Sequence, residues 1–427
     1  MGQALNSELI VFFIILMIIA PVSATGSNAL ESSDSSPYTI TLFIPTASMV
    51  HSTQIMDMVN VPDAPGSVLL ATSYGLSQYN GTWSTRHMNR DNSSEGLLND
   101  YIMAIEYDHL GNLWIGYSGG IQIYNGQYYQ TIRDQQLLKD PRITALQRWN
   151  DDMWVITGNA GIHRYHDREW TWYQPESKEG PGFYEANGMV RDYEADALII
   201  ATDHEGLWQV RSQEHPIQFE CIAPPGSTYG LLTEVRRNPL GGALFFNDTM
   251  VARYSPDSGF SLFLSSDMLS GSDTNINDVA AGNDGRIYLA TDRGIYIWKN
   301  GKIIDYIDRM GGIGTSPTVN WVYVDAENRL WFATNDDVGL MTDQITPNSR
   351  IAINTIVPIN TISPTTTPTI SPLTNTNGTY PGRIPTLRED APITAPAQND
   401  SGGSPLNVVI DPILQVIQTL LAGLGFK

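Results

Sequence analysis

Few residues in this sequence have the types and spacing that catalysis or metal binding requires. His163 and His166 could share a metal ion, but side chains three residues apart on a strand point to opposite faces, which disfavours joint coordination. The single cysteine, Cys221, excludes an internal disulfide and a Cys-rich metal site. The sequence has no Gly-rich phosphate loop, no Gly-x-Ser-x-Gly and no His-Glu-x-x-His motif. We therefore predict no catalytic residue, no metal ion and no cofactor.

The elements that would have to position a site form an internal repeat. Short apolar runs start at residues 68, 113, 153, 198, 243, 287 and 330, so successive starts are 45, 40, 45, 45, 44 and 43 residues apart. A run that is apolar throughout is typical of a strand buried on both faces. Apolar strands and turns rich in Asp, Asn and Gly flank the runs, which gives four antiparallel strands per unit. The sequence predicts an all-β fold, a seven-bladed β-propeller over residues 38–345.

The two ends of this repeat predict how the ring closes. The seventh unit runs from about Val319 to Thr342 and lacks a fourth strand, whereas Tyr38–Ile44 precedes the first unit and resembles a fourth strand. We expect the N-terminal strand to complete the last blade, because this pairing removes an exposed sheet edge. The alternative is that residues 350–357 supply the missing strand.

The turns of the repeat carry a family resemblance. Asp108-His-Leu-Gly-Asn-Leu-Trp-Ile-Gly116 resembles the two-component regulator propeller repeat, as do Asn283-Asp-Gly-Arg-Ile-Tyr-Leu-Ala-Thr291 and Asn328-Arg-Leu-Trp-Phe-Ala-Thr334. Family members often form the periplasmic part of sensor kinases and are taken to bind ligands there. The resemblance therefore implies a propeller that binds ligands outside the cell. No kinase or transmitter region follows the repeats, so it does not imply signalling by this chain itself.

In a propeller, the loops that enter the innermost strands and the turns between second and third strands lie on the same face of the ring. The variable side chains of the repeat meet the channel on that face. Non-repeating residues at these positions are what a binding site on a repeating scaffold would use, the alternative being solvated turn chemistry. The candidates for ligand binding are Tyr74, Asp100, Tyr117, Arg142, Asn187, His204, Asn277, Arg293, Asn320 and Asp336. Among these turns, His204 and Glu205 are the only adjacent acid–base pair.

Two repeating features are expected to be structural. Trp114, Trp154 and Trp331 share one repeat position, which favours packing between blades over ligand stacking. The Asp-x-x-Gly turns lack the further oxygen ligands, at alternating positions, of a calcium loop.

Composition and charge narrow the range of partners. The chain has 427 residues with 24 Lys and Arg against 45 Asp and Glu, a net charge of −21. Such a surface repels phosphate backbones, so we expect no nucleic acid partner. Hydrophobic residues make up 41% and aromatic residues 10%, which is enough for a folded, β-rich core.

The N-terminal segment predicts export. Leu9–Ala20 is an apolar run, and small residues precede a possible cleavage after Ala24, so residues 1–24 are predicted to be a signal peptide and residues 25–37 a linker. No Lys or Arg occurs before Arg86, which leaves an uncleaved anchor as the alternative. An exported chain without disulfides is typical of a prokaryotic extracellular or cell-surface protein. Possible N-glycosylation sequons occur at Asn80, Asn92, Asn247, Asn377 and Asn399.

Residues 346–427, which follow the repeats, differ from them in composition. Residues 346–405 are rich in Pro and Thr, which predicts a disordered, extended stalk. Residues 406–427 are apolar again, with Ile410, Ile413, Ile417 and Leu420 at helical spacing. A short helix there could dock on the protein, self-associate, or make a peripheral contact with a membrane or cell envelope.

These observations favour a non-enzymatic extracellular binding, sensing or protein-interaction module, secreted or tethered to the surface. Its ligand would be a small molecule, a glycan or a protein. One alternative is a propeller lyase or lactonase with a metal-assisted site at the channel mouth, for which His204 and Glu205 are the residues to test. The other is a structural component of the cell envelope.

Overall fold

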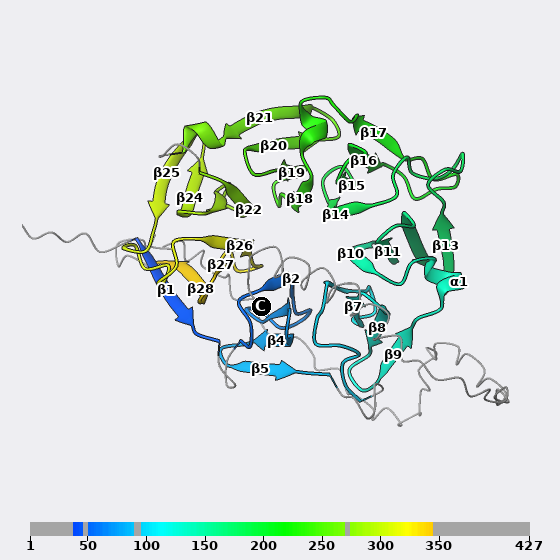
Figure 1. Ribbon diagram of the computed structural model, residues 1–427, viewed down its shortest axis with the longest axis horizontal. Helices are drawn as coiled ribbons and strands as arrows, with labels where there is room; N and C mark the ends of the chain where they lie inside the picture. Colours follow the sequence, from blue (N-terminus) through cyan, green and yellow to red (C-terminus); the bar gives the residue numbers. More distant parts are fainter. Residues whose placement is uncertain (1–36, 46–49, 89–94, 270–273, 345–427) are drawn as a thin grey trace, which may run out of the picture. The chain divides into compact units, whose positions relative to one another are not determined.

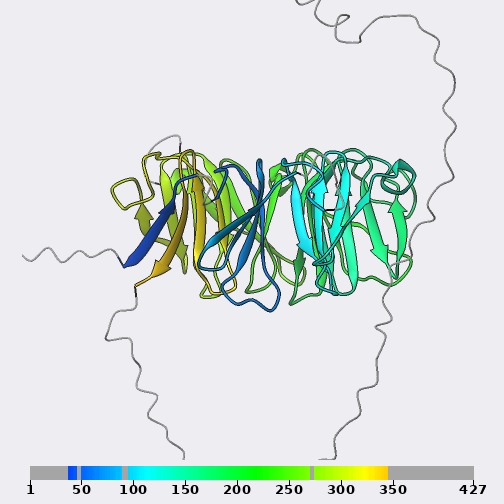
Figure 2. The ribbon, with the colours of Figure 1, turned by 90° about the horizontal axis from the view of Figure 1, so that it is seen from below.

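A computed structural model describes residues 37–45, 50–88, 95–269 and 274–344, which form a ring of seven four-stranded antiparallel sheets (Figure 1). Viewed from the side, the strands run approximately along the ring axis (Figure 2). The prediction of a seven-bladed β-propeller is confirmed. The predicted signal peptide, the stalk and the C-terminal helix lie outside the described residues, as do Asn92, Asn377 and Asn399. None of the helices in the described part is long and apolar enough to cross a bilayer.

The strands of blades 1 to 4 follow one another along the chain, from the channel outwards in each blade. Blade 1 contains β2 (Ile55–Asn60), β3 (Val68–Thr72), β4 (Gly75–Tyr79) and β5 (Trp83–Arg86). Blade 2 contains β6 (Ala104–Tyr107), β7 (Leu113–Tyr117), β8 (Gly120–Tyr124) and β9 (Tyr129–Ile132). Blade 3 follows α1 (Gln135–Leu138) and contains β10 (Ile143–Trp149), β11 (Asp152–Thr157), β12 (Ile162–His166) and β13 (Glu169–Tyr173). Blade 4 contains β14 (Ala186–Asp192), β15 (Ala197–Thr202), β16 (Leu207–Val210) and β17 (Glu220–Ala223).

Blades 5 to 7 complete the ring with the same order. Blade 5 follows the 3-10 turn η1 (Tyr229–Leu231) and contains β18 (Glu234–Arg237), β19 (Ala243–Phe246), β20 (Met250–Ser255) and β21 (Gly259–Ser265). Blade 6 follows η2 (Ser266–Met268) and contains β22 (Ile276–Ala281), β23 (Ile287–Thr291), β24 (Gly294–Lys299) and β25 (Lys302–Ile307). Blade 7 contains β26 (Val319–Val324), β27 (Leu330–Thr334), β28 (Val338–Asp343) and, from the N-terminal end, β1 (Tyr38–Phe43).

The N-terminal strand closes the ring as the sequence predicted. β1 pairs antiparallel with β28 in a continuous register from Tyr38 opposite Asp343 to Phe43 opposite Val338. The Phe43 ring is tilted or edge-on to the rings of Tyr79 and Trp83 in blade 1, at 5.4 and 5.1 Å between centroids. The pairing therefore covers the outer edge of β28 and completes blade 7, and an aromatic cluster fills the junction with blade 1.

Threonine recurs at the end of the middle strands because its hydroxyl closes the next turn. Thr72 and Thr291 donate hydrogen bonds of 2.8 Å to the carbonyls of Gly75 and Gly294. Both glycines have positive φ, and a Cβ on either would lie 2.4 Å from a carbonyl oxygen of the outermost strand. Glycine is therefore required where the third strand begins close to the fourth.

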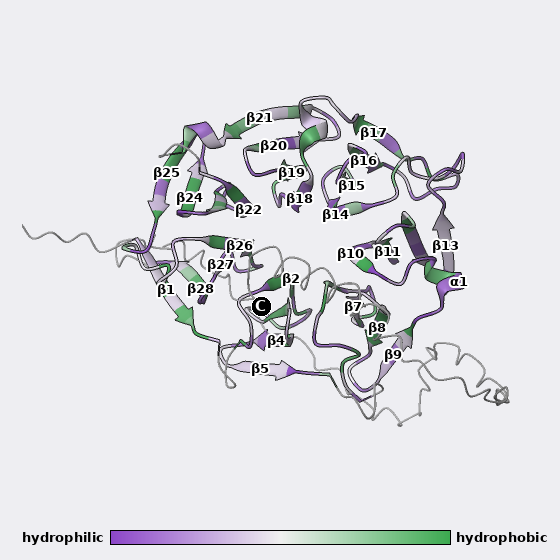
Figure 3. Cartoon of the chain, in the orientation of Figure 1, coloured by the Kyte–Doolittle hydropathy of each residue, from purple (hydrophilic) through white to green (hydrophobic). Residues whose placement is uncertain are grey.

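The core lies between the blades. In the described part of the chain, seven clusters of buried apolar side chains occupy the seven junctions between neighbouring blades. Trp114, Trp154 and Trp331 are 0–1% exposed within these clusters, which confirms their expected packing role. Middle strands such as β3 are buried throughout, whereas outer strands such as β5 alternate and are more polar (Figure 3).

Candidate functional site

The innermost strand of each blade lines the central channel, and its alternating side chains decide what the channel presents. Asp57 on β2 interacts electrostatically with Arg236 on β18, although these strands belong to blades 1 and 5. This interaction crosses the channel, so both side chains face it. Residues at the same register, and two residues along, face the channel as well because strand side chains alternate. The channel-facing charged set is Asp57, Glu106, Glu234, Arg236 and Asp278.

Two aspartates at one register tie neighbouring blades together. Asp57 and Asp278 both lie opposite the fourth residue of their middle strand. One carboxylate oxygen of Asp57 accepts from the Met58 amide, and the other accepts at 2.8 Å from the Ile105 amide of the next blade. Asp278 repeats this pattern, with its second oxygen 3.1 Å from the Val322 amide. These carboxylates satisfy inner-strand amides that have no strand partner on the channel side.

Burial in the channel keeps protons on some of these carboxyls near neutral pH. Loss of solvation raises the pKa of Asp57 to about 6, against the opposing effect of two backbone amides and Arg236. Loss of solvation also raises the pKa of Glu106 to about 7, and the charge of Asp57 adds to this shift. The pKa of Asp278 is raised for the same reason, although the Arg236 guanidinium, 2.9 Å away, opposes the shift. The channel interior therefore contains two carboxyl groups, those of Asp57 and Glu106, whose charge changes near neutral pH.

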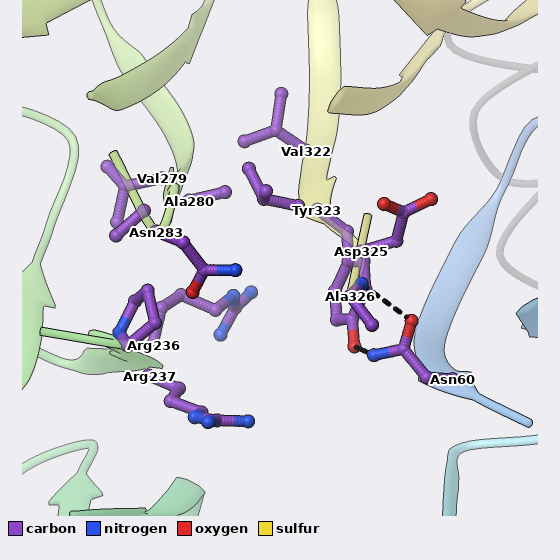
Figure 4. Close-up of a pocket in the computed structure, with 13 residues that line it drawn as sticks. Asn60, Arg236, Arg237, Val279, Ala280, Asn283, Val322, Tyr323, Asp325 and Ala326 are labelled. Carbon is purple, nitrogen blue, oxygen red and sulfur yellow. Dashed lines mark hydrogen bonds between the residues drawn. The ribbon is translucent and has the colours of Figure 1, made fainter. Parts of the chain in front are cut away.

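A pocket of about 290 Å³ opens at the end of the channel where the inner strands terminate, which we call the C-terminal mouth. Blades 5, 6, 7 and 1 contribute its walls. Figure 4 shows the guanidinium groups of Arg236 and Arg237 on one side, and Tyr323, Ala326 and Asn60 on the other. The remaining lining residues are Pro239, Val279, Ala280, Ala281, Asn283, Val322, Val324 and Asp325.

The polar walls of this pocket are held by hydrogen bonds across blades. The Asn60 side chain donates to the Tyr323 hydroxyl at 3.1 Å and accepts from the Ala326 amide at 2.9 Å, so it links blade 1 to blade 7. Asp325 is 3% exposed, because its carboxylate accepts from Arg329 and from the Trp331 indole at 2.7 and 2.9 Å. The pocket therefore has fixed donors and aromatic surface, while its nearest carboxylate is already occupied.

The predicted asparagines lie at the opposite, N-terminal mouth, where inner strands begin. Asn187 and Asn277 donate to carbonyls of the following blade, at Thr233 (3.1 Å) and Val319 (2.8 Å). Asn320 donates to the Asn335 side chain at 2.8 Å and lines a second pocket with Thr53, Gln54, Ile55, Trp321 and Asn335. Two of the three therefore connect blades, and Asn320 faces a pocket.

The other predicted residues are spread around the ring. The Tyr74 ring is tilted against the His87 ring with 5.0 Å between centroids, and Asp100 accepts from the Met88 amide at 2.7 Å. Arg142 pairs with Glu185 (3.0 Å), His204 lies 2.9 Å from Asp203, Asp336 accepts from Thr315 (2.7 Å), and the Arg293 carbonyl accepts from Tyr306 (2.8 Å). Tyr117 differs from the expectation of a surface candidate. It is 1% exposed and donates to Gln122, because its ring fills the junction between blades 1 and 2.

The remaining candidate groups have clear positions. His163 is buried against Trp172 whereas His166 is exposed beside Asp152, so the two imidazoles do point to different environments. Within the described residues, no group of three His, Cys, Asp or Glu side chains is arranged to hold a metal ion. The side-chain oxygens of Asn80 and Asn247 each accept a hydrogen bond from the hydroxyl of the threonine in the same sequon, Thr82 and Thr249. Cys221 is exposed on β17. Glycosylation at the sequons stays a prediction.

Sequence analysis identified neither the charged residues inside the channel nor those of its C-terminal mouth. The available signal was the charged residues inside otherwise apolar inner-strand segments, such as Asp57 in Ile55–Met58 and Asp278 in Ile276–Ala281. A charge at a register that repeats around a ring indicates a channel-facing position. Arg236 and Arg237 lie in the same kind of segment, but consecutive charges hide the alternation there.

Comparisons with known proteins find the fold but no sequence family. The sequence matches no protein-family profile and no curated protein. The structure is similar to the extracellular domain of the one component system BT4673 (TM-score 0.55, 17% identity) and to that of the hybrid two component system BT3049 (0.58, 16%), both from B. thetaiotaomicron, covering 70% and 72% of this chain. It spans only 39% and 42% of those chains. It is also similar to virginiamycin B lyase from Staphylococcus aureus (0.54, 12%), covering 71% of this chain and 99% of that one. At these identities the likeness shows the propeller fold alone.

Proposed function

We propose that the chain is an extracellular binding or sensing module that takes a ligand at the C-terminal mouth and catalyses no reaction. The observation that carries this proposal is the pocket shared by blades 5, 6, 7 and 1. Arg236, Ala280 and Tyr323 occupy one register in three successive blades, yet they differ in size and charge. Variation at a repeating position is typical of a site built on a repeating scaffold.

The size of the pocket restricts its ligand. A volume of about 290 Å³ is near the lower end of small-molecule sites, which span roughly 300–1,000 Å³. A small molecule, a terminal sugar of a glycan or the end of a polypeptide fits such a space. The signal-like segment Leu9–Ala20 and the extracellular domains that share the fold support a location outside the cell.

A ligand screen tests this proposal. The full chain is screened by thermal shift against sugars, peptides and divalent ions, together with two variants. Asn283→Trp places an indole at the pocket mouth, whereas Gln127→Trp makes the same change at an exposed turn between β8 and β9. A ligand that binds the folded state raises the melting temperature. We expect the ligand to stabilise wild type and Gln127→Trp but not Asn283→Trp. An equal response from Asn283→Trp would place binding elsewhere.

One observation favours a lyase or hydrolase as the second candidate. Glu106 and Asp57 face the channel with pKa values of about 7 and 6, so they can exchange protons near neutral pH. An enzyme would show turnover of a stabilising ligand, with an activity that Glu106→Gln abolishes. A binding module would keep the ligand unchanged through prolonged incubation.

A further inference from the structure

We propose that the C-terminal mouth binds an oxyanion group of its ligand, a carboxylate or a sulfate or phosphate ester, through Arg237. This inference rests on the proposed function, because it names the chemistry that the same pocket recognises. It is carried by a comparison within the repeat, in which three arginines share one position but only two of them have polar partners.

The three arginines lie at the same register of successive inner strands. Arg148, Arg191 and Arg237, in blades 3, 4 and 5, each pair with the residue that begins the apolar run of the repeat, at positions 153, 198 and 243. Each reaches towards the first hairpin of the preceding blade. Arg148 donates to the Asp108 carbonyl at 3.5 Å. Arg191 donates to the side chains of Asn150 and Asp196 at 2.8 and 2.7 Å.

Arg237 meets an aromatic ring where its counterparts meet oxygen atoms. Its guanidinium carbon lies 4.3 Å from the centroid of Tyr193, a ring that also contacts the guanidinium of Arg191 at 4.5 Å. The ring fixes the position of the charge without accepting its N–H groups in their plane. Among the described residues, no oxygen accepts a hydrogen bond or forms an ion pair with the Arg237 side chain. Its planar set of donors therefore remains available at the pocket wall.

Three carboxylates in or beside the pocket have partners other than Arg237. Arg236 lies 2.9 Å from Asp278 and 3.7 Å from Glu234, so these acids are paired within the channel. Asp325 is held by Arg329 and Trp331. A guanidinium with free in-plane donors matches the geometry of carboxylates and tetrahedral oxyanions better than that of neutral ligands.

The rest of the pocket indicates a ligand with a less polar body. Ala281 and Val324 occupy in blades 6 and 7 the register that Arg237 occupies in blade 5. The mouth is thus cationic at blade 5 and largely apolar at blades 6 and 7, where Asn283 adds a side-chain amide and Tyr323 an aromatic ring. An acidic sugar, with one oxyanion on a ring that has apolar faces, has this distribution of groups.

Calorimetric titration of the full chain tests the inference with three probes: D-glucuronate, D-glucose as its neutral counterpart, and inorganic sulfate. Arg237→Gln removes the proposed donor. Arg211→Gln, on an exposed arginine paired with Asp257, removes the same charge away from the channel. We expect glucuronate or sulfate to bind wild type and Arg211→Gln equally, and Arg237→Gln at least tenfold more weakly, because a charge-assisted hydrogen bond is lost. Glucose should not bind.

The outcomes separate this inference from the proposed function. Absence of oxyanion binding to wild type up to millimolar concentration overturns it, as does equal binding to wild type and Arg237→Gln. A neutral ligand that Asn283→Trp excludes and Arg237→Gln still binds would keep the pocket as the site and reject the oxyanion. Oxyanion binding that depends on Arg237 but not on Asn283→Trp would keep the anion site and reject the pocket. Circular dichroism of each variant verifies that it is folded.

Discussion

The buried carboxyl of Glu106 should make the stability of the propeller depend on pH. Glu106 accepts hydrogen bonds from the Tyr107 amide at 2.8 Å and from Gln147 at 3.2 Å, and it lies deep in the channel. Its pKa is raised from 4.5 to about 7, chiefly by loss of solvation. The perturbation is Glu106→Gln, which keeps the shape of the side chain and removes the titration.

The sign and size of the effect follow from linkage. Because the folded state holds the proton more tightly than the unfolded state, the stabilisation is fully present below pH 4.5 and is lost as the pH rises through 7. The shift of about 2.5 pH units, at roughly 1.4 kcal/mol per unit, corresponds to about 3 kcal/mol. The difference in unfolding free energy between Glu106→Gln and wild type should therefore change by about 3 kcal/mol from pH 4.5 to pH 8, in favour of the variant at high pH.

Urea unfolding followed by tryptophan fluorescence measures this difference at a series of pH values. Any fixed change in hydrogen bonding by the amide is the same at every pH and drops out of the comparison. Glu169→Gln, on the exposed outer strand β13, is the control and should run parallel to wild type. If Glu106→Gln also runs parallel to wild type between pH 4.5 and 8, the carboxyl is solvated and the account of the channel is wrong.

Two further predictions concern other parts of the fold. His163 is buried without a hydrogen-bond partner on either ring nitrogen, and its pKa is lowered from 6.5 to about 4. The contribution of the neutral His163 imidazole to the free energy of unfolding is present above pH 6.5 and is lost as the pH falls through 4. The His163→Leu variant should therefore be more stable than wild type in acid, by up to about 3 kcal/mol. Urea midpoints at pH 4 and pH 7 measure this difference. Unchanged acid sensitivity would mean that the imidazole is hydrated. Phe43→Ala should destabilise the protein by about 3–5 kcal/mol because it removes the aromatic seal between blades 7 and 1, whereas Ile44→Ala, at 63% exposure, should change little. Similar urea midpoints for the two variants would show that the ring is closed by backbone pairing alone.

The fold could be predicted from the sequence because the same pattern of apolar strands and turns occurs seven times. Runs such as Val68–Thr72 and Leu330–Thr334 are buried throughout, and only strands covered on both sides have that composition. The missing fourth strand of the last unit and the surplus strand at Tyr38 each implied the other. Even the recurrent threonine has a local cause, the hydrogen bond from its hydroxyl into the following turn.

The site was less accessible because side-chain partners, not positions, decide what a residue does. Asn187 and Asn277 lie where inner strands begin, at one channel mouth, but both side-chain amides are used to connect blades. Sequence shows that an asparagine begins an inner strand. It does not show that the carbonyl of the next blade lies within hydrogen-bond distance, since that distance depends on the tilt between sheets. Arg237 was overlooked for the complementary reason, because its significance is the lack of an oxygen partner.

The charged side chains differ between the two ends of the channel, and this difference affects whether an anionic or a cationic ligand is favoured at each end. Asp57, Glu234 and Asp278 pair with the fourth residue of the apolar run in their blade, whereas Arg148, Arg191 and Arg237 pair with the first residue and so lie three residues farther along the inner strand. Among the charged inner-strand residues, these three carboxyls therefore lie nearer the N-terminal mouth and these three guanidinium groups nearer the C-terminal mouth, with Glu106 and Arg236 at one register between them. Arg237 lines the pocket at this second end without an oxygen partner among the described residues, so we expect an anion to bind there in preference to the acidic N-terminal end of the channel. A ligand with one acidic and one basic group would then have a single favoured orientation along the axis, with its acid at Arg237 and its base towards Asp57.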